Sequence, residues 1–448
     1  MEFIKEADEA IAIWSDGDIE GAIFESPEEY VYEFSEVMAL ISKHHFYSND
    51  LPNENFSFIA NSSLSGGAHP CSSPDCRKKR LDELASFSAL YADEVYIQNP
   101  FEKILLRGNQ SIRAVERHEV LAGIHNYLYL KPLIEKGLIK YATINVSFCE
   151  EHSEEIGKPL TDSIRNKEDK LIEALEAYLK EKCKVTFDFT AGNKEKPFFE
   201  VAGPEDIIEH GGIYFHAYEP IPEMFAPYIE KKVPYILTQE EVEESKVLDL
   251  IIGPIINDLS AQEWHSALNG TSYLCDNKTH MKIASKINSK VYAANSNVFE
   301  NALEHYLPAI HSKDPSVILS LRLREEEAFA VYRDKLNKFM QESSSWDKAE
   351  VSKIFRDQLL PEINLIEKKV KDWKSNAREG IAEKLLFSTA IATVGLYEGL
   401  LPANIGEIVA AVGGVSAVAG TLMEYNKTLK EKQEARKNDF YFLWQASQ

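Results

Sequence analysis

Cysteine and histidine side chains in the first third of the chain have the types and spacing of a structural zinc site. Cys71 and Cys76 form a C-x4-C pair, and Cys149 and His152 form a later C-x2-H pair. Three thiolates and one imidazole complete the tetrahedral shell of structural zinc, which leaves no position for a substrate. His69 is a further donor beside Cys71. The sequence therefore predicts a zinc ion that staples the fold; the alternative is that these are ordinary thiols and an unrelated histidine.

The loop that carries Cys71 also has the composition of an anion site. Small residues end a predicted strand, and basic residues occupy the first turns of the helix that follows. Backbone N–H groups, a helix N-terminus and cations together bind phosphate groups. The candidate ligands of a phosphate or nucleotide are Ser65, Gly66, Gly67, Arg77 and Lys78. Neither G-x-x-x-x-G-K-[ST] nor G-x-G-x-x-G occurs, so the alternative is a surface loop before a solvated basic turn.

Other polar residues do not match the pattern of a known type of catalytic or metal site. His118 and His125 are too far apart for the metalloprotease motif, in which the two histidines are about four residues apart. No G-x-S-x-G elbow occurs, so a common serine hydrolase is unsupported. Arg322 and Arg324 precede the acidic run 325–327. That pattern predicts ion pairs on a helix surface rather than an active site.

The candidate sites lie in a stretch, residues 56–101, that has the pattern of strand, loop, helix and strand. Ser73-Pro74-Asp75 predicts the helix start, because Ser caps well, Pro suits the first position and an acid favours the first turn. A helical pattern over 115–133 and an apolar strand over 139–148 follow. This alternation predicts a small three-layer α/β domain with a mainly parallel sheet. The carboxyl ends of such strands share one edge, which would bring the two zinc-site pairs together.

The chain divides into three predicted regions by its pattern. Residues 1–155 form the α/β domain, residues 156–312 a mixed α/β or α+β domain, and residues 313–448 an all-helical region. In the middle region, Thr238 and Glu241 have the spacing of a capping box. They predict a helix that runs toward residue 259 and is interrupted near residues 253–254.

Two uncharged segments, 385–397 and 408–423, predict an apolar helical hairpin over residues 385–424. Small residues recur at short intervals in the second segment and permit close helix contact. Basic flanks suit a membrane hairpin with both ends in the cytoplasm. Both segments are, however, shorter than the roughly 20 residues that span a bilayer. We therefore favour a hairpin buried in protein or in an oligomer interface over membrane association.

The composition bounds the class of protein. The chain has 448 residues and a formal net charge of −23, which disfavours broad nucleic-acid binding because that binding relies on Lys and Arg. Five cysteines are few and odd in number, which fits a reducing compartment. The first twenty residues are acidic and resemble no secretory signal. We expect a cytoplasmic protein.

Since no complete catalytic set is recognisable, the sequence favours an intracellular interaction or regulatory protein. It would self-associate, or bind a protein partner, through its helical C-terminus, as a component of a bacterial defence-type assembly would. One alternative is a hydrolase or nucleotide-processing enzyme that uses the loop at residues 61–80. The other is a membrane-acting effector that works through the C-terminal hairpin.

Overall fold

The computed structural model describes residues 2–48, 57–102, 114–143, 149–276 and 309–331 with short gaps, the strand at 385–388 and a few isolated positions. The prediction of an N-terminal α/β region with a parallel sheet is confirmed within these residues.

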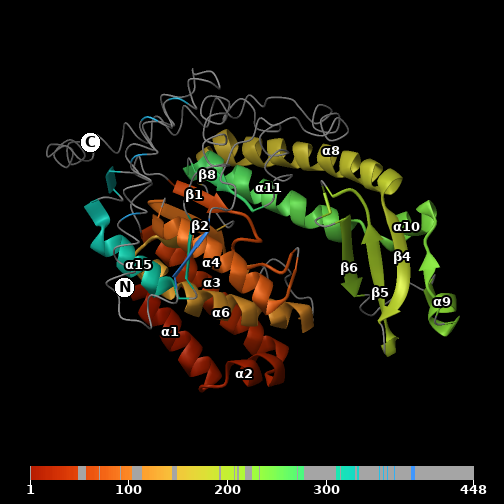
Figure 1. The fold of residues 1–448 in the computed structure, drawn as a ribbon, viewed down its shortest axis with the longest axis horizontal. Helices are drawn as coiled ribbons and strands as arrows, with labels where there is room; N and C mark the ends of the chain where they lie inside the picture. Colours follow the sequence, from red (N-terminus) through yellow and green to blue (C-terminus); the bar gives the residue numbers. More distant parts are fainter. Residues whose placement is uncertain are drawn as a thin grey trace.

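A parallel sheet of four strands organises this region (Figure 1). The strands are β1 (Ser57–Ala60), β2 (Glu94–Gln98), β3 (Ile139–Ala142) and β8 (Ser272–Leu274), in the spatial order β3-β2-β1-β8. Each neighbouring pair is parallel; Phe58, for example, lies opposite both Val95 and Ser272. Strands buried on both faces need apolar side chains throughout, and β1 and β3 are buried along their whole length.

One face of the sheet packs on helices of the N-terminal region and on one helix that lies much later in the chain. Phe58, Val95, Ile97 and Ile139 point into this core. The helices that cover or flank it are α1 (Glu2–Ser15), α2 (Ile19–Glu25), α3 (Glu28–Ser48), α4 (Pro74–Leu90), α6 (Ala114–Glu135) and α15 (Pro315–Arg324). α4 begins at Pro74, so the predicted helix start is confirmed.

The other face is covered by two long helices, α8 (Lys158–Lys182) and α11 (Asp249–Asn269), which pack on each other (Figure 1). Ile59, Tyr96 and Ala142 of the sheet belong to this second core. The short helix α7 (Glu150–His152) and the π-helical turn η1 (Ser153–Gly157) lead into α8. Helices therefore cover both faces of the sheet, as the three-layer prediction required.

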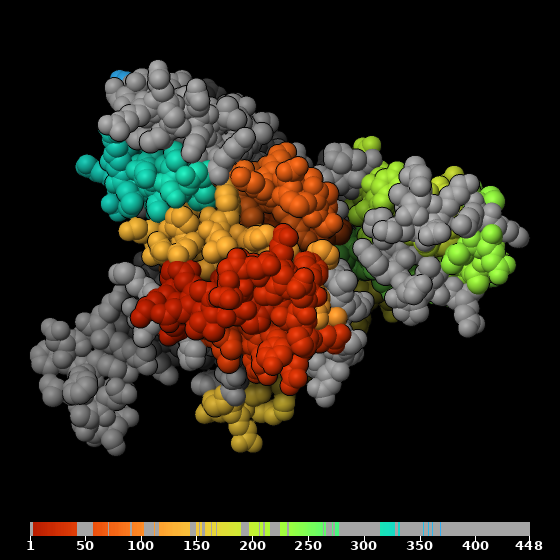
Figure 2. All heavy atoms as spheres, turned by 90° about the horizontal axis from the view of Figure 1, so that it is seen from below, coloured from red at the N-terminus to blue at the C-terminus, as the bar shows by residue number. Residues whose placement is uncertain are grey.

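A second, antiparallel sheet lies at the far end of α8 and α11 (Figure 1). Its strands are β4 (Lys184–Thr190), β5 (Asn193–Ala202), β6 (Gly212–His216) and β7 (Tyr235–Ile236), in the order β6-β5-β4-β7. Phe187 stacks on Phe225 with ring centroids 4.8 Å apart, just before the helix α9 (Ala226–Lys231). In the space-filling view this yellow-green part projects to one side of the red and orange α/β part (Figure 2).

The capping box is confirmed, but the predicted helix interruption is wrong. Thr238 and Glu241 exchange both capping bonds at the start of α10 (Gln239–Ser245). α10 ends at Lys246, whose φ of +55° is left-handed. α11 then begins at Asp249 and continues through Pro254. The helical segment is interrupted at Lys246, whose left-handed backbone ends α10, and Pro254, eight residues later, lies within α11.

The first residues of the predicted apolar hairpin form a strand. β10 (Leu385–Ser388) pairs antiparallel with β9 (Ala309–Ser312). The prediction that a helix begins at Leu385 is therefore wrong for these residues; a short apolar run suits a strand as well as a helix. The rest of the hairpin, 389–424, lies outside the described residues.

Candidate functional site

The order of the parallel strands reverses direction at β1. The chain passes from β1 to β2 to β3 through α4 and α6, which lie on one face of the sheet. It then returns on the other face through α11 and adds β8 on the opposite side of β1. Ligands of open α/β sheets bind in the crevice at the carboxyl ends of strands where such a reversal occurs. The topology therefore places a candidate site at the ends of β1 and β8.

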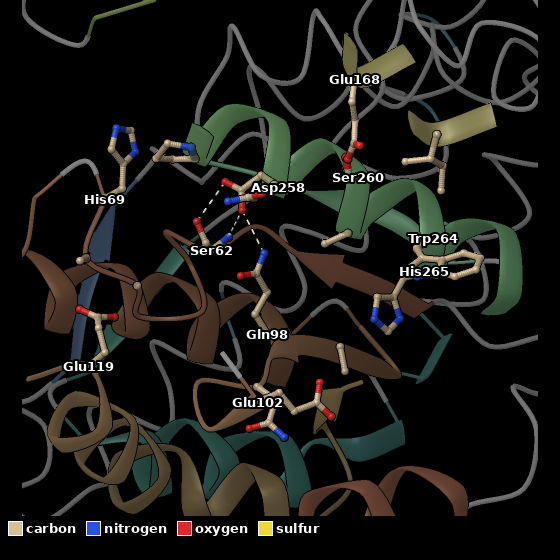
Figure 3. Close-up of a pocket in the computed structure, with 18 of the residues that line it drawn as sticks. Ser62, His69, Gln98, Glu102, Glu119, Glu168, Asp258, Ser260, Trp264 and His265 are labelled. Atoms are coloured by element: carbon tan, nitrogen blue, oxygen red, sulfur yellow. Dashed lines mark hydrogen bonds between the residues drawn. The ribbon is translucent and has the colours of Figure 1, made fainter. Parts of the chain in front are cut away.

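A cavity of about 760 Å³ opens at this edge of the sheet (Figure 3). That volume is in the range of small-molecule and cofactor sites. Its walls come from the β1–α4 loop, the end of β2, α6, α8 and α11. The polar and aromatic residues that line it are Ser62, His69, Gln98, Asn99, Glu102, Glu119, Thr161, Arg165, Glu168, Asn257, Asp258, Ser260, Trp264 and His265.

Asp258 joins three walls of the cavity. Its carboxylate accepts three hydrogen bonds: from the Ser62 N–H at 2.8 Å, from the Ser62 hydroxyl at 3.1 Å and from the Gln98 side-chain amide at 3.0 Å (Figure 3). The residue is only 3% exposed. A buried carboxylate needs such donors, and here they hold α11 against the ends of β1 and β2.

Two further carboxylates link the ends of neighbouring strands by hydrogen bonds. Asp276, just after β8, accepts hydrogen bonds from the Asn61 side-chain amide at 2.9 Å and from the Ser63 hydroxyl at 2.5 Å. Glu102, after β2, accepts the Thr143 hydroxyl at 2.6 Å from the end of β3. Each strand of the sheet therefore contributes polar side chains at its carboxyl end.

The β1–α4 loop is closed on itself. The N–H groups of Ser65, Gly66 and Gly67 donate to the carbonyls of Asn61, Ser63 and Ser62, at 2.8 to 3.0 Å. Gly66 has a φ of +80°, and a Cβ on Gly67 would lie 2.7 Å from the Ser62 carbonyl oxygen. The two glycines are needed because the loop is tight, and the turn bonds use the N–H groups that would otherwise face a phosphate.

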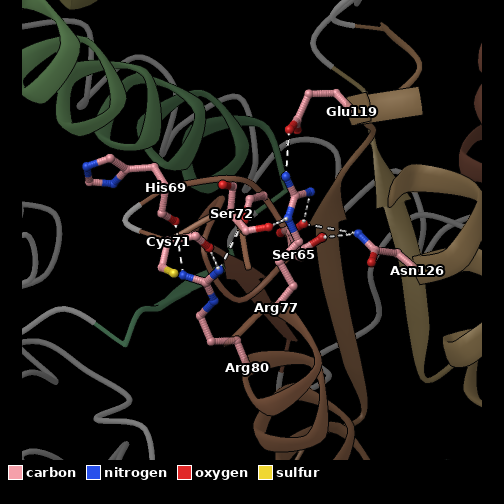
Figure 4. A network of polar contacts seen from close by, with 10 residues as sticks. Ser65, His69, Cys71, Ser72, Arg77, Arg80, Glu119 and Asn126 are labelled. Atoms are coloured by element: carbon pink, nitrogen blue, oxygen red, sulfur yellow. Dashed lines mark hydrogen bonds and ion pairs between the residues drawn. The ribbon is translucent and has the colours of Figure 1, made fainter. Parts of the chain in front are cut away.

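Two arginines hold the rest of this loop (Figure 4). Arg77 donates to the carbonyls of Gly66 and Ser72, both at 3.2 Å, and pairs with Glu119 at 2.7 Å. Arg80 donates to the Cys71 carbonyl at 2.6 Å and also to those of Gly67 and His69. Both guanidinium groups are buried among their acceptors, so they act as staples of the loop.

The predicted anion ligands are close in the fold but engaged in different contacts. Ser65, Gly66 and Gly67 form the tight turn just described. Arg77 binds the loop and Glu119, and the Lys78 ammonium lies 5.5 Å from the centre of the Tyr129 ring on α6. The anion site at these residues stays a prediction.

The structure brings two of the predicted zinc ligands, Cys71 and Cys76, together, whereas Cys149 lies beyond β3. Cys71 and Cys76 are exposed in the loop and the first turn of α4, and the hydrogen bond between them raises the pKa of the Cys76 thiol. Cys149 is exposed before α7, beyond β3, and β2 separates β3 from β1. The side chain of His152 lies outside the described ones. Within the described residues no group of three or more His, Cys, Asp or Glu is placed to hold a metal, and the zinc site stays a prediction.

The cavity residues Asn99, Glu102, Asp258 and His265 did not stand out in the sequence. Asn99 and Glu102 directly follow a predicted strand, which is where site residues of α/β sheets occur. Asp258 and His265 return to the same face of one helix, within an otherwise apolar stretch. Polar residues repeating on an apolar helix face were the signal that could have found them.

Burial keeps His265 neutral. Its ring is 3% exposed, stacks on Tyr96 at 6.3 Å, and burial lowers its pKa to about 4. The unfolded chain takes up this proton below about pH 6.5 and the folded chain only below about 4. We therefore expect the free energy of unfolding to decrease by on the order of 3 kcal/mol as the pH falls across this window.

Urea unfolding of the wild type and His265→Phe between pH 4 and pH 7 measures this effect, because the phenyl ring keeps the stacking on Tyr96 but does not titrate. The control is His125→Phe, since His125 is exposed on α6. Parallel pH profiles for the wild type and His265→Phe would show that the prediction is wrong.

Among the described helices, none combines the length and the apolar composition needed to cross a bilayer. No protein-family model, no curated protein and no solved structure matches the chain.

Proposed function

We propose that this chain is a small-molecule enzyme of the hydrolytic, nucleoside- or nucleotide-processing kind, with the cavity beside the β1–α4 loop as its active site. The observation that carries the proposal is the cavity's position at the reversal of strand order, with Asp258 and Glu102 buried in its walls. Nucleotide-type ligands bind α/β sheets at this position.

The side chains support acid–base chemistry. A buried carboxylate can accept a proton from an attacking water, and a second group can return a proton to the leaving atom. Glu102, Glu168 and Asp258 supply carboxylates in one cavity, and His265 supplies a neutral imidazole. Trp264 adds a flat apolar surface on which a nucleobase can stack.

Calorimetric titration with the four common ribonucleosides and with their 5′-monophosphates tests whether the protein binds them. Chromatography of each mixture then tests whether hydrolysis products have formed. We expect saturable binding of at least one compound with a stoichiometry near one, together with slow product formation. If no compound of either set binds, the cavity does not have this function.

A further inference from the structure

The charged groups around the cavity are mainly acidic. Glu102 and Asp258 are 3% exposed, and Glu168 accepts the Ser260 hydroxyl at the α8–α11 side (Figure 3). Among the described residues, Arg165 is the arginine or lysine that lines the cavity, and it is exposed to solvent. A ligand phosphate in the depth of this cavity would meet like charge, which is costly in a poorly solvated site.

The usual donors for a phosphate are already used. The N–H groups of Ser65, Gly66 and Gly67 close the loop, and the N–H of Ser62 donates to Asp258. The guanidinium of Arg77 is held by two loop carbonyls and Glu119. These backbone N–H groups and the Arg77 guanidinium are therefore engaged within the protein and are not free to bind a phosphate.

One buried amide in the cavity wall has a nitrogen with no hydrogen-bond partner among the described residues. Asn99 is 5% exposed, and its Oδ1 accepts the Phe101 N–H at 3.1 Å. Asn99 is one of the residues that line the cavity, and no acceptor among the described residues lies within hydrogen-bond distance of its buried Nδ2. Leaving a buried amide donor unpaired is costly, and an oxygen atom of a bound ligand would remove that cost.

We infer that the cavity takes the unphosphorylated, hydroxyl-bearing part of a nucleoside, and that Asn99 determines this specificity by donating to a ligand oxygen while Glu102 and Asp258 accept from ligand hydroxyls. The inference rests on the proposed function and narrows its substrate class. Nucleosides should bind more tightly than their 5′-monophosphates, by about tenfold or more, because the phosphate would bring its negative charge close to the buried carboxylates of Glu102 and Asp258.

The Asn99→Ser variant tests the role of the amide. A serine hydroxyl can still accept the Phe101 N–H but does not reach as far into the cavity, and it adds no charge. We expect the dissociation constant for the tightest-binding nucleoside to rise by about tenfold, with the thermal midpoint nearly unchanged. The matched control is Gln262→Met on α11, because Gln262 is 1% exposed and has an unpaired amide but does not line the cavity.

Calorimetry and thermal melting of both variants separate the outcomes. Weaker binding in Asn99→Ser with wild-type binding in Gln262→Met supports the inference. Equal binding in both variants overturns the inference, because the Asn99 amide would then not donate to the ligand. Tighter binding of the monophosphates than of the nucleosides also overturns it, yet leaves the proposed function standing. Only the failure of all nucleosides and nucleotides to bind the wild type removes both.

Discussion

Replacing Asp258 with alanine is expected to lower the free energy of unfolding by about 2–4 kcal/mol and to abolish ligand binding. The carboxylate accepts from the Ser62 N–H, the Ser62 hydroxyl and the Gln98 amide. Alanine would leave these donors without their acceptor at a site that is 3% exposed. Urea unfolding followed by tryptophan fluorescence, and titration with nucleosides, measure the two effects.

Two control variants accompany this prediction: one changes the same residue differently, and the other changes a residue elsewhere on the same helix. Asp258→Asn keeps the shape and one acceptor oxygen, so its stability should fall between those of the wild type and the alanine variant. Asp249→Ala removes an exposed acid from the first turn of α11 and should cost about 0.5 kcal/mol or less. If Asp258→Ala is as stable as Asp249→Ala, the carboxylate does not hold the three walls together.

Replacing Arg322 with methionine is expected to destabilise the fold by about 3 kcal/mol. Its Nη1 donates to the carbonyls of Ser88, Ala89 and Ala92, at 2.9 to 3.1 Å, where α4 ends. Carbonyls at a helix C-terminus lack partners within the helix, and a cation there also complements the helix dipole. Methionine fills a similar volume but leaves these buried acceptors unsatisfied.

The control for this prediction lies two residues along the same helix. Arg324 is exposed and is 3.9 Å from Glu325, a surface ion pair worth little. Chemical unfolding of Arg322→Met and Arg324→Met should give clearly different midpoints. Similar midpoints would mean that Arg322 is no more important than a surface residue.

The sequence prediction for these two arginines was right for one and wrong for the other. Arg324 makes the predicted surface pair, whereas Arg322 is buried against the end of α4. Periodicity shows which residues share a helix face but not what packs on that face. The acceptors of Arg322 lie more than two hundred residues away in the chain, so local pattern could not reveal them.

Local signals predicted the local structure well. The Ser-Pro-Asp start of α4 and the Thr238 capping box depend on neighbouring residues, and both are confirmed. The parallel pairing of β1, β2 and β3 was predicted from the alternation of strands and helices, and it is confirmed as well. β8 is a strand of three residues whose partner β1 is far away in sequence. Nothing in such a short segment could indicate where it would pair.

The candidate site was predicted only in part for the same reason. The loop after β1 was recognised, but its basic residues were interpreted as ligand groups. In the structure Arg77 and Arg80 bind loop carbonyls, because a tight turn with several inward-facing carbonyls needs donors of its own. The acidic wall comes from Asp258 on α11 and Glu102 after β2, and only the tertiary fold brings these together.

The position of β8 also bears on how the protein is made. A ribosome releases the chain from its N-terminus, so β1, β2 and β3 emerge long before residues 272–274. Until β8 follows α11, which ends at Asn269, one edge of β1 is unpaired, and this leaves an open strand edge exposed to other chains. The antiparallel sheet can form during this interval, since β4 to β7 pair only among themselves. We therefore expect nascent chains that stop before residue 272 to need chaperone protection, and the cavity to form only after α11, which supplies one of its walls, has been made.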